Sequence, residues 1–460
     1  MAAGKGTRMK SALPKVLHRL AGRSLLQHVV DTAAELGADR IVVVTGHGAE
    51  VVEASVATPG VRSVRQEPQL GTGHAVQQAL PALHDEGTTL ILNGDVPLIE
   101  AGTCRALLEA CADENLALLV VELDDPTGYG RVLRGDAAGR SAREGGRVRA
   151  IVEHKDATAS QRAIREVYTG IMAVPTGYLR RWLAGLRNDN AQGEYYLTDI
   201  VGMSVAERVP VVTARARDPG EVLGVNSPQQ LAALERSLQR RRAEALLDAG
   251  VRLADPARFD QRGELLCGSD VEIDVNCVFE GSVQLGDGVR IGANCVIRNA
   301  RIEAGAVILP FTWMDGATIG AGAIVGPFAR LRPGAVLGED VHIGNFVEVK
   351  NSTLARGAKA NHLAYLGDAT VGERVNYGAG SITANYDGAN KHRTVIGPDA
   401  HIGSNCVLVA PVTVGEGATI GGGSTIAADA PAGQLTLARA RQVTLPDWKR
   451  PVKRGAKPKP

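Results

Sequence analysis

The sequence has few aromatic residues, almost no net charge and no long apolar run. Only 3% of its 460 residues are Phe, Trp or Tyr, and the formal net charge is +1. A chain so nearly neutral has no overall field that would gather nucleic acid or an anionic membrane. No stretch of about 18 apolar residues occurs, and no apolar signal region opens the chain. We therefore expect a cytoplasmic protein that has neither a nucleic-acid partner nor a membrane span.

Cysteine is scarce and unpatterned. The six cysteines show no C-x-x-C spacing, which excludes a recognisable disulfide framework or a cysteine zinc site. Reduced thiols fit the cytoplasm. The charge balance departs from neutrality in the final residues, 441–460, where a basic, proline-containing tail is expected; its cations are Lys449, Arg450, Lys453, Arg454, Lys457 and Lys459.

Glycine is abundant, at 55 residues, or about one in eight against a usual share of about 7%. Residues 1–225 nevertheless have the pattern of an α/β domain. Continuous apolar segments at Ile41–Thr45 and Thr89–Leu92 alternate with helical patterns such as Ser24–Leu36. Such strands predict a parallel sheet buried on both faces, in a Rossmann-like arrangement.

A linker helix is expected over residues 226–250. Ser227 suits its N-cap, Pro228 its first turn and Gln230 a capping box, and Gly250 can end it. Its leucines recur on one face, at Leu231, Leu234 and Leu238.

From about Leu265 to Ala430, inside a domain expected over residues 251–440, the apolar period becomes six, and a small residue commonly follows the aliphatic one four places on. Three hexads make one triangular turn, so the pattern predicts a left-handed parallel β-helix with a continuous aliphatic column. Cys277, Cys295 and Cys406 take the small position, which packing explains. The aliphatic series is Ile273, Phe279, Leu285, Ile291, Ile297, Ile319, Val325, Leu331, Leu337, Ile343, Val349, Ile396, Ile402, Leu408, Val414, Ile420 and Ile426.

The hexads are interrupted between Gly378 and Thr394 by a polar segment containing Asn385–Gly388 and Lys391–Arg393. A solenoid accommodates an insertion as a loop outside its stack, and such loops often carry binding groups. A functional site is therefore expected there.

The first domain opens with a glycine-rich segment that is neither a Walker A loop nor a GxGxxG fingerprint, because Met stands at position 9. Its small residues let backbone N–H groups approach phosphates, and Arg8 and Lys15 supply positive charge. Asp95 follows a buried strand at the edge where open α/β sheets bind ligands. A turn or helix-cap aspartate is the alternative, but a hard oxygen donor there favours a Mg²⁺ ligand.

In the β-helix, His362 and Tyr365 stand three residues apart, near the cations Arg330, Arg332 and Lys350 on neighbouring hexads. A lone histidine on a solenoid is usually a polar surface residue. Cations placed to share one phosphate favour a site instead, with the histidine as base for an amine that attacks a thioester directly.

The ordered motifs closely resemble the family of bifunctional N-acetylglucosamine-1-phosphate uridyltransferases/glucosamine-1-phosphate N-acetyltransferases, over essentially the whole chain. In the first half they are Met1–Met9, Pro14–Leu17, Gln66 with Leu70–Ala75, Gly94–Leu98, Gly128–Arg131 and Ile151–Asp156. In the second half they are Gly326–Pro333, Asn345–Lys350, Asn361–Asp368 and Asn385–Gly388.

The resemblance implies two reactions of UDP-N-acetylglucosamine synthesis, which supplies peptidoglycan and lipopolysaccharide. Acetyl-CoA would acetylate glucosamine 1-phosphate, and UTP would then uridylylate the product with Mg²⁺, releasing pyrophosphate. The family is a homotrimer. The implied nucleotide and sugar-nucleotide contacts are Ala2, Ala3, Gly4, Lys15, Gln66, Gly71, Thr72, Gly94, Asp95, Gly130, Glu153, Tyr168 and Asn226, with Asp95 and Asn226 on the metal.

For the acetyltransferase, the resemblance implies His362 as general base. Arg332, Lys350, Tyr365 and Asn376 would bind glucosamine 1-phosphate. The implied acetyl-CoA contacts are Ala379, Asn385, Tyr386, Ser404, Gly422 and Arg439.

The chain departs from the family in three places. The family has an apolar strand before the glycine-rich segment, whereas this sequence starts at that segment, so a central strand is expected to be missing from the first sheet. Tyr168 stands where the family usually has a sugar-contacting Asn, and Gly422 replaces an Ala.

Two other functions remain open at this point. One is a nucleotidyltransferase for another sugar or nucleotide with a purely structural β-helix, and the other is a non-catalytic scaffold. The His362 segment and the Asn385 loop disfavour both.

Overall fold

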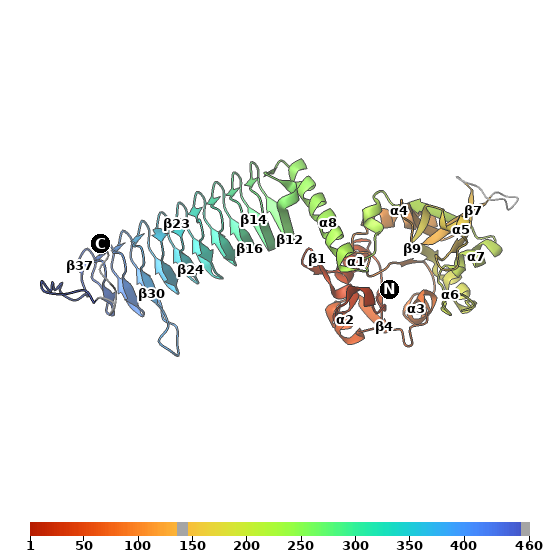
Figure 1. Cartoon of the computed structure of the whole chain (residues 1–460), viewed down its shortest axis with the longest axis horizontal. Helices are drawn as coiled ribbons and strands as arrows, with labels where there is room; N and C mark the ends of the chain where they lie inside the picture. Colours follow the sequence, from red (N-terminus) through yellow and green to blue (C-terminus); the bar gives the residue numbers. More distant parts are fainter. Residues whose placement is uncertain (136–145, 452–460) are drawn as a thin grey trace, which may run out of the picture. The chain divides into compact units, whose positions relative to one another are not determined.

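The computed structural model describes residues 1–135 and 146–451 and divides into two compact units, Met1–Arg242 and Ala243–Pro460. Figure 1 shows an α/β unit and a stack of coils. The predicted boundaries at 225, 250 and 440 remain predictions, and residues 452–460 of the predicted tail lie outside the described residues.

The first unit contains a six-stranded mixed sheet in the order β10-β6-β9-β7-β8, with β5 also paired to β9. The sequence predicted a parallel sheet, but only β10 and β6 pair in parallel; β9 runs antiparallel to β5, β6 and β7. Apolar runs report burial on two faces and carry no information on strand direction. The strands are β5 (Thr88–Ile91), β6 (Leu116–Glu122), β7 (Gly130–Gly135), β8 (Arg147–Val152), β9 (Glu166–Pro175) and β10 (Val211–Arg215).

Two further strands, β3 (Ile41–Thr45) and β4 (Val61–Arg65), form a separate parallel sheet. Within the described residues β3 pairs with β4 and β5 with β9, so this pair and the larger sheet are separate. A short hairpin, β1 (Arg19–Leu20) with β2 (Arg23–Ser24), precedes α1.

Helices pack on both faces of these strands, as the separate apolar clusters around β6 and β9 require. The predicted helix at residues 24–36 is confirmed as α1 (Leu25–Glu35), whose N-cap Ser24 accepts a hydrogen bond from the Gln27 N–H. The others are α2 (Ala49–Ser55), α3 (Thr72–Ala79), α4 (Ala101–Cys111), α5 (Ala159–Arg162), α6 (Thr176–Ala184) and α7 (Asp199–Ala206).

The helix predicted over 226–250 is α8 (Pro228–Asp248). The Gln230 N–H donates to the Ser227 hydroxyl at 3.3 Å, and the Gln230 side chain accepts from the Asn226 N–H at 2.7 Å. Leu231, Leu234 and Leu238 pack into an apolar cluster of the first unit. The division between the units falls within this helix, after Arg242.

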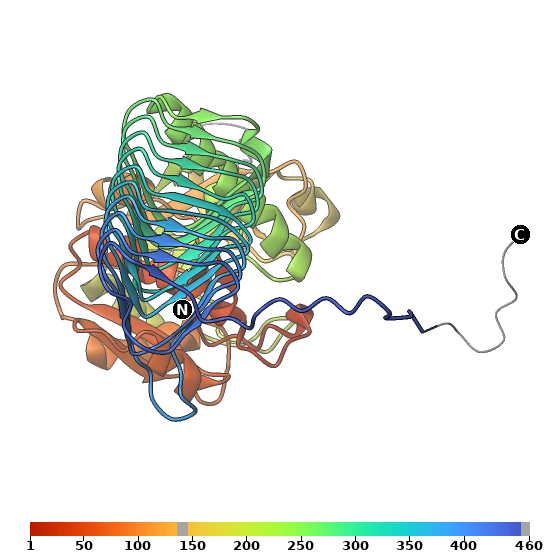
Figure 2. The ribbon, with the colours of Figure 1, turned by 90° about the vertical axis from the view of Figure 1, so that its left-hand side faces the viewer.

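The second unit is a parallel β-helix, whose stacked coils are visible in Figure 2. Strands pair with the strand one coil later, as Ile273 pairs with Ile291 and Ile291 with Ile308. One face consists of β11 (Arg252–Leu253), β13 (Glu272–Ile273), β15 (Arg290–Ile291), β17 (Val307–Ile308), β20 (Ile324–Val325), β23 (His342–Asn345), β26 (Lys359–His362), β29 (Asn376–Tyr377), β32 (His401–Ile402), β35 (Thr419–Ile420) and β37 (Leu435–Thr436).

The other two faces belong to one sixteen-stranded sheet, joined at its long first strands, β12 (Phe259–Cys267), β14 (Cys277–Leu285) and β16 (Val296–Ile302). One carries β19 (Ala317–Ile319), β22 (Ala335–Leu337), β25 (Thr353–Leu354), β28 (Ala369–Val371), β31 (Thr394–Ile396) and β34 (Val412–Val414). The other carries β18 (Trp313–Asp315), β21 (Arg330–Leu331), β24 (Glu348–Lys350), β27 (Tyr365–Gly367), β30 (Ile382–Ala384), β33 (Val407–Val409) and β36 (Thr425–Ile426).

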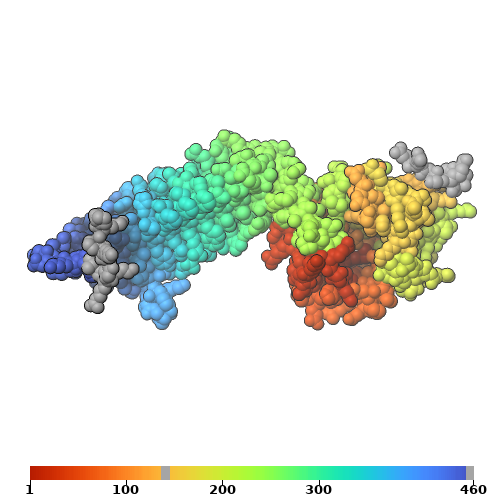
Figure 3. Space-filling view, in the orientation of Figure 1, coloured from red at the N-terminus to blue at the C-terminus, as the bar shows by residue number. Residues whose placement is uncertain are grey.

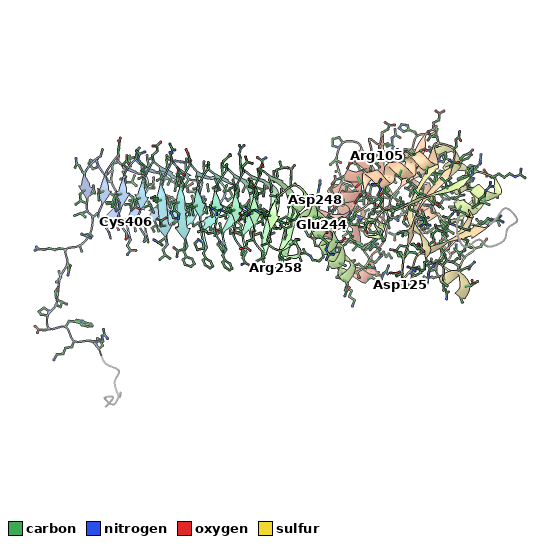
Figure 4. The ribbon with its side chains drawn as sticks, turned by 90° about the horizontal axis from the view of Figure 1, so that it is seen from above. Arg105, Asp125, Glu244, Asp248, Arg258 and Cys406 are labelled. Atoms are coloured by element: carbon green, nitrogen blue, oxygen red, sulfur yellow. The ribbon has the colours of Figure 1, made fainter. Side chains whose placement is uncertain are left out.

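The predicted aliphatic column is confirmed, because every member of the series is at most 3% exposed. The three cysteines in the small positions are buried, and their thiols donate to backbone carbonyls, as Cys406 does to Gly421 at 3.4 Å. Cys406 lies among the coils in Figure 4.

The interruption of the hexads is a loop between β30 and β31. The register along one face shows it, since Asn376 pairs with His401 on the next coil, 25 residues later, whereas Glu272 pairs with Arg290, 18 residues later. Figure 3 shows this segment projecting from the β-helix surface. None of the helices in the described ranges combines the length and apolar character that crossing a bilayer needs.

Two candidate active sites

Three polar side chains distant in sequence converge in the first unit. The Lys15 ammonium lies 2.5 Å from an Asp95 carboxylate oxygen and 3.1 Å from the Asn226 amide oxygen. Lys15 lies in a short 3₁₀ turn (Lys15–Leu17), Asp95 follows β5, and Asn226 precedes α8. A hydrogen bond from the Val225 N–H to the Asp95 carbonyl, at 2.9 Å, holds the last two segments together.

Two of these three side chains, Asp95 and Asn226, could bind a hard divalent cation. Asp95 and Asn226 offer carboxylate and amide oxygens, the donors such ions prefer. Within the described ranges no group of three or more His, Cys, Asp or Glu could hold a metal. An ion between Asp95 and Asn226 would therefore complete its shell with water and phosphate oxygens, as Mg²⁺ commonly does at phosphate sites.

The glycine-rich segment is held by its backbone. The Ala2 N–H donates to the Val44 carbonyl at 2.7 Å, and the Ala3 carbonyl accepts from the His47 N–H and the Gln69 amide. The space beside the Gly4 Cα is open for about 4 Å. The turn therefore consists of small residues with open space beside Gly4, and the ligand contacts of Ala2, Ala3 and Gly4 remain predictions.

A second turn lies around Gly71. Buried Gln66 donates to the Gly71 carbonyl at 2.8 Å, and the Thr72 hydroxyl accepts from the Leu197 N–H at 3.1 Å. A Cβ on Gly71 would lie 2.7 Å from the Tyr195 carbonyl oxygen, so this glycine permits the close approach. The predicted uracil-side residues are thus one structural group.

Half-buried Glu153 and buried Tyr168 lie near Gly130. The Thr198 hydroxyl donates to Glu153 at 3.1 Å, and burial raises the pKa of that carboxyl. The Tyr168 hydroxyl has no hydrogen-bond partner within the described ranges, and burial, with Glu153 nearby, raises its pKa well above normal. A Cβ on Gly130 would come within 3.6 Å of Glu153.

Gly94 is also closely packed, since a Cβ there would lie 3.1 Å from the Met1 carbonyl oxygen. Sequence reasoning missed the segment Glu194–Thr198, which touches both the Gly71 turn and Glu153. Its polar and aromatic composition, Glu-Tyr-Tyr-Leu-Thr, was the available signal.

In the second unit, exposed His362 ends β26, and its Nδ1 lies 2.8 Å from the Asn345 amide oxygen on the preceding coil. An acceptor at Nδ1 favours the tautomer with the proton there, leaving Nε2 free to take a proton. The His362 carbonyl also accepts from the Gly380 N–H, beside Ala379.

A mixed-charge network lies on neighbouring coils. Lys350 is 3.5 Å from Asp368, and Arg332 donates to Glu348 at 2.9 Å. Although burial alone would raise it, hydrogen bonds from Asn351 and Asn385, with the Lys350 charge, keep the pKa of Asp368 low.

The loop after β30 joins this network. Lys350 lies close to Lys391, and its positive charge lowers the pKa of Lys391. Asn385 donates to Asp368, while Tyr386 is exposed and donates to the Gly388 carbonyl at 2.6 Å. The loop thus brings polar groups to the cations Arg332 and Lys350.

The remaining predicted residues form a column on later coils. The Arg439 guanidinium donates to the Gly422 carbonyl at 2.8 Å, and a Cβ on Gly422 would lie 3.3 Å from the Ser404 carbonyl. The Ala379 carbonyl accepts from the Asn405 N–H, next to Ser404. Asn376 contacts His401, and the Tyr365 hydroxyl lies over Gly367.

Family models match three stretches of the chain. Residues 1–134 match the MobA-like NTP transferase domain, residues 261–356 the GMPPB C-terminal domain, and residues 393–428 the bacterial transferase hexapeptide repeat. The first and third descriptions fit an α/β nucleotidyltransferase unit and a β-helix of hexads.

Curated relatives match over nearly the full length of both partners. The Bifunctional protein GlmU of Methylibium petroleiphilum is 74% identical over 99% of this chain and 98% of its own. The Bifunctional protein GlmU of Cupriavidus pinatubonensis is 62% identical over 99% of this chain and 98% of its own. The chain belongs to the GlmU family. The resemblance, fold class and bifunctional character predicted from sequence are confirmed.

Two solved structures resemble part of the GlmU-family chain. An apo UDP-glucose pyrophosphorylase covers 52% of this chain and 97% of its own, with 16% identity and a TM-score of 0.40. A nucleotidyl transferase from Methanothermobacter thermautotroptrophicus matches over 52% of this chain and 95% of its own, with 21% identity and a TM-score of 0.36.

Proposed function

We propose that the chain converts glucosamine 1-phosphate to UDP-N-acetylglucosamine, by acetyl transfer in the β-helix and then uridylyl transfer in the α/β unit. Its family pairs uridyltransferase with glucosamine-1-phosphate acetyltransferase activity and works with a divalent metal. The observation that carries the assignment of sites is that each unit holds its own convergent polar cluster, around Lys15 and around Lys350.

For uridylyl transfer, a phosphate oxygen of N-acetylglucosamine 1-phosphate attacks the α-phosphorus of UTP in line, and pyrophosphate leaves. Asp95 and Asn226 would hold Mg²⁺, which neutralises phosphate charge when bound. Lys15 exchanges its contact with Asp95 for the nucleotide phosphates and stabilises the charge that develops. Ala2, Ala3 and Gly4 line the phosphates.

The nucleoside and the sugar contact different groups of residues. Gln66, Gly71 and Thr72 hold the uracil, while Gly94, Gly130, Glu153 and Tyr168 line the sugar. The orphan Tyr168 hydroxyl supports this, because a buried polar group without a partner is costly unless a ligand or water satisfies it.

For acetyl transfer, His362 Nε2 takes the proton as the sugar amine attacks the thioester carbonyl of acetyl-CoA, and Asn345 orients the ring. The C–S bond then breaks, and coenzyme A leaves as a thiolate that takes up a proton. Arg332, Lys350, Tyr365 and Asn376 bind glucosamine 1-phosphate. The acetyl-CoA contacts are Ala379, Asn385, Tyr386, Ser404, Gly422 and Arg439. Direct attack needs no covalent acyl-enzyme.

The proposed working form is a cytoplasmic homotrimer with UTP, acetyl-CoA and amino-sugar phosphates as its small-molecule partners. Exposed Phe311, Phe328 and Phe346, stacked on successive coils, support a subunit contact along the β-helix.

Separate assays of the half-reactions test the two sites. His362→Ala should lower acetyl transfer by about 10²- to 10⁴-fold and leave uridylyl transfer intact, while His342→Ala on a neighbouring coil serves as its control. Asp95→Ala should do the reverse, with exposed Asp85→Ala as control. Comparable loss of both reactions in either variant contradicts the assignment of two independent sites.

A further inference from the structure

One buried carboxylate of the β-helix is not used by the proposed reactions. Asp368 is 7% exposed and lies at the corner between β27 and β28, in a left-handed backbone conformation with φ +51°. Its N–H donates to the Lys350 carbonyl at 3.1 Å, and its carbonyl accepts from the Thr394 N–H at 3.2 Å. These bonds fix the corner between the preceding coil and the strand that follows the inserted loop.

Both oxygens of the Asp368 carboxylate have partners. The Asn351 amide donates to Oδ1 at 2.5 Å. Oδ2 accepts from the Asn385 amide and lies 3.5 Å from the Lys350 ammonium. Burying a carboxylate is costly unless such partners replace its water. The positions of these side chains are therefore tied to that of the carboxylate.

The two partners of Oδ2 belong to different halves of the proposed acetyltransferase site. Lys350, at the end of β24, is a proposed contact of glucosamine 1-phosphate. Asn385, in the loop after β30, is a proposed contact of acetyl-CoA. One oxygen atom of Asp368 thus holds a group that serves each substrate.

The charge of Asp368 has a second effect on Lys350. Lys391 of the loop lies close to Lys350, and the repulsion between them lowers the pKa of Lys391. Across the part of the chain that the structure describes, Lys350 pairs with no other carboxylate, whereas Arg332 has its own partner in Glu348 at 2.9 Å. Asp368 therefore offsets a repulsion that would turn the Lys350 ammonium away from the site.

We propose that Asp368 is a positioning residue for acetyl transfer, which holds Lys350 for the sugar phosphate and Asn385 for acetyl-CoA through one carboxylate oxygen. This role rests on the proposed acetyl transfer and adds to it a residue that acts through two others. The separation of 3.5 Å leaves Lys350 free to exchange Asp368 for a phosphate oxygen, while the shorter bond to Asn385 keeps the loop in place.

Acetyl transfer by the full chain, with each substrate varied in turn, tests this role. Asp368→Asn keeps the size of the side chain but removes its charge and one of its two acceptor oxygens. It should raise KM for glucosamine 1-phosphate and KM for acetyl-CoA by about fivefold or more each. The matched control is Asn351→Gly, which removes only the donor to Oδ1 and suits the left-handed φ of +45° at that position. Both KM values of the control should stay close to those of the parent chain.

The outcomes separate positioning from a structural role. A rise in both KM values for Asp368→Asn supports the proposal. A lower free energy of unfolding with both KM values unchanged is the result of a purely structural carboxylate and overturns it, as does a rise in only one KM. Absence of acetyl transfer in the parent chain contradicts the proposed function, and this role with it.

A double-mutant cycle checks that Asp368 acts through Lys350. Lys350→Met alone should raise KM for glucosamine 1-phosphate, and adding Asp368→Asn should raise it no further. Effects that multiply contradict positioning through Lys350. If Asp368→Asn does not fold, Asp368→Glu replaces it in both tests, because the extra methylene displaces the carboxylate from both partners while keeping its charge. Unchanged KM values in that variant overturn the proposal.

Discussion

Replacing Gly71 with alanine should disable the first site without unfolding the chain. Gly71 has φ +104° and ψ 176°, a backbone conformation that is essentially confined to glycine. Its new Cβ would lie 2.7 Å from the Tyr195 carbonyl oxygen and 2.8 Å from the Glu194 Cβ. The turn must therefore either accept the strain or move.

The magnitude follows from that geometry. Strain at such a position costs about 1–3 kcal/mol. If the turn holds the uracil, a comparable loss of transition-state stabilisation lowers kcat/KM for UTP by about 5- to 150-fold. Acetyl transfer, which occurs in the other unit, should not change.

Pyrophosphate release at varied UTP concentration measures the effect. The matched control is Gly102→Ala in α4, where an added Cβ has nothing within 4 Å and both assays should match the parent chain. An unchanged kcat/KM for UTP in Gly71→Ala would refute the reasoning that this turn must hold its conformation against Tyr195.

Three other changes have defined outcomes. Tyr168→Phe should raise KM for N-acetylglucosamine 1-phosphate by about fivefold, the worth of one hydrogen bond, without lowering the free energy of unfolding; an unchanged KM argues against the sugar contact. Because burial raises the pKa of Glu153 above 4.5, its contribution to stability is complete below that value and is lost as pH rises through the raised pKa. Glu153→Gln should therefore reduce the change of the urea-unfolding free energy with pH in this range. An identical change with pH in the variant and the parent chain contradicts a raised pKa of Glu153. Fully buried Leu331→Ala should cost the β-helix about 2–5 kcal/mol in denaturant while sparing uridylyl transfer, and a smaller loss would mean that the column relaxes around the cavity.

The sequence alone was sufficient for the second unit. Each hexad carries its own aliphatic and small residue, and each coil packs mainly on the coils beside it, so Ile343 and Cys406 were placed correctly from spacing. The first unit was less predictable. Two of its strands, at Ile41–Thr45 and Thr89–Leu92, and α1 were recognised, but the reversed direction of β9 was not, because burial patterns do not record direction.

The two candidate sites were likewise predictable from sequence only in part. The motifs around Lys15, Asp95 and Asn226 were visible in sequence, yet the meeting of Lys15 with Asn226 across 211 positions depends on the fold. The contact of Thr198 with Glu153 and that of Asn385 with Asp368 are likewise tertiary. The sequence by itself determined the family, the two-unit organisation and the β-helix, because those signals are local and repeated. Only the tertiary structure decided which side chains share a site, since that depends on how distant segments pack.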